Sequence, residues 1–189
     1  MKTAVLKTCA LTALAAAIGL MAPQAQAGHL NIVLEAELDG RQEVASDARN
    51  RRIVGDPQGR GEAYVFGIDG DRNTICYIVL VDRIGELHEP PGNGRQAHIH
   101  RGPKGANGPV VVSLAWPQDG RAADCISETR ILPNGSPAFA RDANGNLRAT
   151  AAEILTNPEA FYVNVHNAEY PAGAVRGQLS DTLDPDRGR

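Results

Sequence analysis

The sequence predicts an all-β fold, an antiparallel β-sandwich or Greek-key barrel with one short helix. Three observations support this prediction: short segments of alternating hydrophobicity, turn residues between them, and only one credible helical pattern. Gly and Pro contribute 20 and 12 of the 189 residues. Many short strands joined by Gly- and Pro-containing turns are typical of sandwiches and barrels. With 42% hydrophobic and 22% charged residues, the chain has the composition of an ordinary globular domain.

The first 27 residues have the pattern of a secretory signal peptide. Lys2 and Lys7 precede a short apolar run over residues 9–21, and Ala25-Gln26-Ala27 forms a small-x-small cleavage pattern. The apolar run is too short to span a bilayer. We therefore expect a signal peptide at 1–27 and a single domain at 28–189, exported to the periplasm or the extracellular space, with no membrane span in the mature chain.

The first predicted strand, residues 30–38, places its leucines on one face and Glu35 and Glu37 on the other, as a half-buried strand does. The segment 74–81 is almost continuously apolar and is expected to be a central strand. A short helix is predicted at 149–155, ended by Asn157-Pro158, after a Gly- and Asn-rich loop at 133–148. The remaining strands are predicted at 62–68, 96–101, 110–114, 161–166 and 174–179.

Two cysteines, Cys76 and Cys125, remain once the signal peptide has been removed. In an oxidising compartment such a pair tends to form a disulfide. The alternative is two free buried thiols. A cysteine metal site is not predicted, because the sequence has no Cys-x-x-Cys spacing.

Charge and motif content narrow the classes of function. The net charge of −3 excludes a strongly basic nucleic-acid-binding protein. The sequence contains no Gly-x-Ser-x-Gly nucleophile motif and no phosphate-binding P-loop. We therefore expect a binding protein, with a protein or a metal ion as its partner, rather than an enzyme of these classes.

The segment Ala97-His98-Ile99-His100 is the most informative motif. Side chains two residues apart on a strand project from the same face, so both imidazoles point in one direction. A strand can present two nitrogen ligands to one metal ion in this way. On its own the motif is weak, because surface strands contain it by chance.

A third histidine, His166, ends the predicted strand 161–166. It shares a face with Tyr162 and Asn164, opposite an apolar face that we expect to be in the core. If this strand lies beside the one that carries His98 and His100, three imidazoles converge, as in sites for copper or zinc. Asn164 and Tyr162 are then expected to support the ligands. The alternative is three unrelated histidines that bond turn backbone.

Two further histidines, His29 and His88, are candidate additional ligands. His29 is expected to be the second residue of the mature chain, and His88 lies in a polar loop. No pattern in the sequence places either of them near the other three, and each is expected to be solvated.

These motifs resemble the CHRD domain, a module named after animal chordin that also occurs alone in exported bacterial proteins. The resemblance rests on the following segments: 38–44, 55–61, 75–77, 97–112, 157–166 and 170–179. It implies an exported all-β module without a known reaction, and it includes His98, His100 and His166 as motif members. Glu43 and Arg176 also lie in matching segments and are expected to form a buried ion pair or hydrogen-bond network.

Three functions follow from these residues. The leading hypothesis is an exported binding module that holds copper or zinc with His98, His100 and His166. A second is a copper-dependent redox enzyme of the superoxide dismutase type, although five histidines are too few for the full dinuclear site. A third is a metal-free structural or adhesive module that works through its sheet surface and loops.

Overall fold

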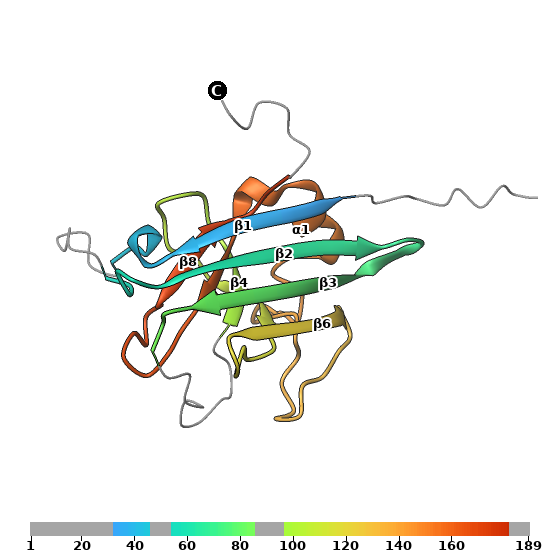
Figure 1. Cartoon of the computed structure of the whole chain (residues 1–189). Coiled ribbons are helices and arrows are strands. Elements are labelled where there is room, and N and C mark those ends of the chain that lie inside the picture. Colours follow the sequence, from blue (N-terminus) through green and yellow to red (C-terminus); the bar gives the residue numbers. More distant parts are fainter. Residues whose placement is uncertain (1–31, 46–53, 86–96, 182–189) are drawn as a thin grey trace, which may run out of the picture.

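The computed structural model describes residues 32–45, 54–85 and 97–181. The predicted signal peptide, His29 and His88 lie outside these residues. The described chain forms an antiparallel, nearly closed barrel of eight strands in the order β5-β4-β7-β8-β1-β2-β3-β6. Figure 1 shows β1, β2, β3 and β6 side by side on the near wall of the barrel. Of the two predicted all-β architectures, the barrel is the one that forms.

The strands and helices follow the predicted order with modest shifts at their ends. The strands are β1 (Val33–Asp39), β2 (Arg60–Ile68), β3 (Asp71–Asp82), β4 (Ala97–Arg101), β5 (Val110–Leu114), β6 (Arg121–Ser127), β7 (Phe161–Val165), β8 (Val175–Gln178) and β9 (Ser180–Asp181). The helices are α1 (Ala151–Thr156) and the 3-10 turns η1 (Gly40–Gln42) and η2 (Pro158–Ala160). The short β9 pairs with β1 beside β8.

Strand β6 is an element that the sequence pattern does not predict. Its residues run Arg-Ala-Ala-Asp-Cys-Ile-Ser, and only Ile126 is fully buried. An edge strand with little buried surface lacks the alternation that identifies other strands. The Cys76–Cys125 disulfide is present, as predicted, and it joins directly opposite residues of β3 and β6.

The barrel opens between β5 and β6, and residues 130–140 bridge the opening. The Ala138 N–H donates to the Arg130 carbonyl just beyond β6, and the Ala138 carbonyl accepts from the Ser113 backbone N–H of β5. Inside the barrel, the Tyr77 hydroxyl of β3 accepts a hydrogen bond of 2.6 Å from the Ala115 N–H beyond β5. The predicted loop at 133–148 thus contains no strand but helps to close the barrel.

The inward faces of the strands form the hydrophobic core. Leu34, Leu38, Ile75, Ile99 and Phe161 are among its fully buried side chains. Helix α1 starts at residue 151, two residues later than predicted, because the Thr150 hydroxyl caps it by accepting from the Glu153 N–H. Among the described residues, no helix has the length and hydrophobicity needed to cross a membrane.

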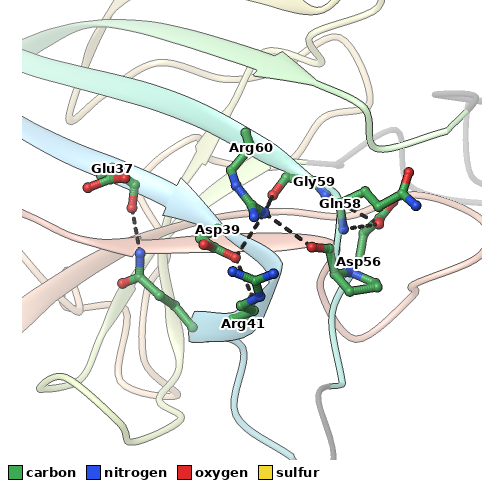
Figure 2. A network of polar contacts seen from close by, with 9 residues as sticks. Glu37, Asp39, Arg41, Asp56, Gln58, Gly59 and Arg60 are labelled. Atoms are coloured by element: carbon green, nitrogen blue, oxygen red, sulfur yellow. Dashed lines mark hydrogen bonds and ion pairs between the residues drawn. The ribbon is translucent and has the colours of Figure 1, made fainter.

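A polar network fixes the turn that follows β1 (Figure 2). Arg60 donates to the Asp39 carboxylate at 3.1 Å and to the Gly59 carbonyl at 2.6 Å, while Asp39 also accepts from the backbone N–H of Arg41. The Gln42 side chain donates to the Glu37 carbonyl at 2.8 Å. These contacts hold η1 against β1 and β2 and so direct the following residues, 43–45, across the outside of the barrel.

Candidate metal centre

Strands β4 and β7 are neighbours, as the three-histidine hypothesis requires. They pair antiparallel, with His98 opposite Asn164 and His100 opposite Tyr162. Ile99 and Val163 are fully buried and face the core. The alternation of the two strands therefore puts both β4 histidines on the outer surface of the barrel wall. His166 follows β7 directly and lies on the same surface.

The three imidazoles converge. Their ring centroids are 5.5 Å apart for His98–His100, 5.1 Å for His98–His166 and 6.4 Å for His100–His166. One nitrogen from each ring lies within 4.8 Å of the other two. Metal–nitrogen bonds of about 2.0–2.1 Å separate tetrahedral ligand atoms by about 3.4 Å, so small rotations of the rings suffice to bring the nitrogens to ligand distance.

Backbone carbonyls fix the tautomer of two of these histidines. His100 Nδ1 donates to the Gly108 oxygen at 2.9 Å, and His166 Nδ1 donates to the Pro171 oxygen at 3.1 Å. Because a carbonyl oxygen only accepts, each Nδ1 carries the proton and each Nε2 presents a lone pair. Both Nε2 atoms are buried and have no hydrogen-bond partner within the described part of the chain. Metal-binding histidines typically have this arrangement.

Burial favours the neutral form of the His100 and His166 imidazoles. Desolvation lowers the pKa of His100 to about 4, helped by the charges of His166 and Arg176, while its hydrogen bond to Gly108 opposes the shift. Desolvation also lowers the pKa of His166, against the opposing effect of its bond to Pro171. Both rings are therefore in the form that a metal ion requires over the neutral pH range.

Gly108 holds the carbonyl that orients His100. A Cβ on this residue would collide with the Arg101 backbone oxygen. Any other residue here must displace the loop from β4 and remove the hydrogen bond to the His100 ring. The 102–109 loop is thus part of the site through its backbone, a contribution that no side-chain motif identifies.

Tyr162 supports His100 directly. The two rings stack with centroids 4.8 Å apart and an interplanar angle of 11°. On the other side of Tyr162, the guanidinium carbon of Arg176 lies 3.4 Å from the ring centroid. Because β4 and β8 flank β7 on opposite sides, the phenol ring lies between the imidazole and the guanidinium. The predicted supporting position of Tyr162 thus agrees with these contacts, although its role in metal binding stays a prediction.

Asn164 is held by Glu43. Its Nδ2 donates to the Glu43 carboxylate at 2.6 Å, and its Oδ1 is buried without a hydrogen-bond partner among the described residues. Gly173, with a φ of +144°, lets the backbone pass beside this contact, since a Cβ there would lie 2.5 Å from Glu43 Oε1. Desolvation raises the pKa of Glu43 to about 7, although the positive charge of Arg176 opposes this shift.

Arg176 forms the hydrogen-bond network that its position in the matching segment suggested. It is 2% exposed and donates to the carbonyls of Ala106 and Pro103 and to the Asn107 side chain. No ion pair forms between it and Glu43 at direct contact distance. Arg176 therefore fastens the 102–109 loop over the histidines.

Ser113 is a neighbour of the cluster that the sequence analysis missed. It lies on β5 directly opposite His98, and its hydroxyl is buried without a hydrogen-bond partner in the described residues. A single hydroxyl in the apolar strand Val110–Leu114 is the sequence signal that marks it.

The fold and this cluster define a small all-β barrel domain with a three-histidine centre on its outer wall. The CHRD domain model matches residues 34–179, so the chain belongs to the CHRD domain family. Neither a curated protein nor a solved structure gives a match. The family assignment confirms the resemblance seen in the sequence and supplies no reaction.

Proposed function

We propose that this chain is an exported CHRD-domain protein that binds one copper or zinc ion through His98, His100 and His166. The observation that carries the proposal is the pair of buried Nε2 lone pairs on His100 and His166, each fixed by an Nδ1–H bond to a backbone carbonyl. Both metals accept neutral imidazole ligands.

Of the two metals, we expect copper to bind this site more tightly than zinc. Divalent copper binds a given set of nitrogen ligands more strongly than divalent zinc does. The Cys76–Cys125 disulfide fits an oxidising compartment, where copper(II) persists. The predicted signal peptide at 1–27 also supports export to such a compartment.

Calorimetric titration of the chelator-treated protein with copper(II) and with zinc tests the proposal. We expect one site per chain, with nitrogen hyperfine splitting in the copper(II) electron paramagnetic resonance spectrum. Replacing His98, His100 or His166 with Gln removes one of three ligands and is expected to weaken binding by about 100-fold or more. Glu62→Gln, which removes an exposed carboxylate of β2, is the control for stray surface binding and leaves the affinity unchanged.

The outcomes separate the competing functions. Unchanged metal affinity in a folded triple His→Gln variant contradicts the proposal and leaves the structural or adhesive module. Superoxide turnover by the copper-loaded protein above the rate of free copper assigns the redox enzyme instead. Thermal unfolding of each variant in chelator shows whether the variant is folded, so lost binding is not confused with lost structure.

A further inference from the structure

A cavity lies beside the histidine cluster, between residues 41–44 and the 102–109 loop. Its volume is about 320 Å³, at the lower end of the range for small-molecule sites. The residues that line it are Arg41, Gln42, Glu43, Val44, Lys104, Gly105, Arg176 and Gln178. Three of these side chains are cations, and they come from three separate segments: η1, the 102–109 loop and β8.

None of the three cations has a carboxylate at ion-pair distance among the residues that the structure describes. In contrast, Arg60, Arg83 and Arg101 each pair with a carboxylate, at 3.1, 3.1 and 2.6 Å. In Figure 2, Arg41 contacts Asp39 through its backbone N–H, whereas Arg60 reaches the same carboxylate with its guanidinium. Among the described residues, the cavity therefore gathers three cations that have no ion pair, and the carboxylate in its lining belongs to Glu43.

Arg176 makes the arrangement costly without an anion. It is almost fully buried, and its Nη atoms bond carbonyl and amide oxygens, which are neutral and leave its net charge in place. A buried charge of this kind normally has an opposite charge beside it. Glu43 is the single acidic residue among the described residues that line the cavity. Burial raises its pKa to about 7 against the positive charge of Arg176, so its carboxylate offsets that charge only in part at neutral pH.

We propose that this cavity binds a small oxyanion, a carboxylate or a phosphate, between Arg41, Lys104 and Arg176. Guanidinium and ammonium groups recognise both kinds of anion by charge-assisted hydrogen bonds. The buried guanidinium forms the floor of the site, and the two exposed cations contact the ligand from the rim. The site does not depend on the metal, so the two proposals succeed or fail separately.

The test is calorimetric titration of the full-length chain with inorganic phosphate and, separately, with citrate, at low ionic strength. Chelator treatment before the titration removes metal that would itself bind these anions. We expect saturable binding at one site per chain. The tighter of the two anions identifies whether the natural ligand is a phosphate or a carboxylate.

The variants use only exposed cations, so that folding is preserved. Arg41→Gln and Lys104→Gln are each expected to weaken binding about tenfold, as for the loss of one charge-assisted hydrogen bond. Arg72→Gln with Arg121→Gln is the matched control, because it removes two exposed positive charges from β3 and β6. Absence of saturable binding in the wild type, or an equal loss in the control, overturns the proposal.

Discussion

The outer barrel wall has two halves: one buries polar side chains, and the other exposes apolar side chains. On the covered face, formed by β4, β7 and β8, the polar side chains of Asn164 and Arg176 are only 3% and 2% exposed. On the bare face, formed by β1, β2, β3 and β6, the apolar side chains of Ile78 and Leu80 are 37% and 39% exposed. The difference shows that the overlying loops, rather than side-chain polarity, determine burial on this surface.

Two segments produce the covered face. The 102–109 loop and residues 43–45 lie over it and are joined where Asn107 donates to the Val44 carbonyl at 3.0 Å. Polar groups enclosed in this way need fixed partners, and they obtain them from backbone carbonyls and from each other. The bare face has no such cover among the described residues, and the Cys76–Cys125 disulfide cross-links two of its strands, β3 and β6.

Loss of that cross-link is expected to have the largest effect. In the chain-entropy model, a disulfide between residues 49 apart contributes about 4 kcal/mol to the free energy of unfolding. We expect the Cys76→Ala/Cys125→Ala variant to lose most of this value in urea denaturation. A loss below about 1 kcal/mol contradicts the idea that the bare face depends on its covalent bond.

The free energy of unfolding is expected to depend on pH through Glu43, on the covered face. Its pKa of about 7 in the folded state lies above the ordinary value of 4.5, so the folded protein binds the additional proton. The resulting stability is fully present below about pH 4.5 and is lost as the pH rises through 7. The full shift corresponds to about 3 kcal/mol.

The measurement is the difference in unfolding free energy between Glu43→Gln and the wild type, both in chelator, from pH 4.5 to 8. The variant keeps an acceptor for Asn164 but does not titrate. The comparison with the variant is needed because His100 also affects the unfolding free energy. Its pKa is lowered to about 4, so His100 makes the stability rise with pH over much of this range, opposite to the effect of Glu43. A difference independent of pH contradicts the titration of Glu43.

Substitutions on the bare face are expected to have the smallest effect. Ile78→Thr and Leu80→Thr replace side chains that are more than a third exposed with threonine, a residue of high strand propensity. We expect each to change the unfolding free energy by less than about 1 kcal/mol, measured by urea denaturation. A loss of 2 kcal/mol or more indicates that this face is covered in solution.

The sequence predicted the parts of the fold and site that depend on local spacing. The two-residue period put His98 beside His100 and put His166 on the face of Tyr162 and Asn164, and the structure brings all three histidines together. The Cys76–Cys125 bond followed from the residue count and the expected compartment. The family match at residues 34–179 was expected from motifs spread over the same range.

Contacts between distant segments could not be predicted in this way. Glu43 and Asn164 are 121 residues apart. The periodicity of a strand in the sequence does not predict whether a loop covers its outer face. The burial of Tyr162 and the position of Gly108 over His100 depend on the same loop. Strand β6 escaped detection because its pattern is that of an exposed edge.

The edge of β6 also has features that oppose pairing with a strand of another molecule. The Cα atoms of Cys76 and Cys125 are 4.0 Å apart, the spacing of a pair without mutual backbone bonds, so the Cys125 N–H points away from β3. The Asp124 carboxylate accepts this N–H at 2.7 Å. A foreign strand approaching the open side of the barrel therefore meets a blocked donor and a negative charge, which discourages amyloid-like stacking of neighbouring molecules.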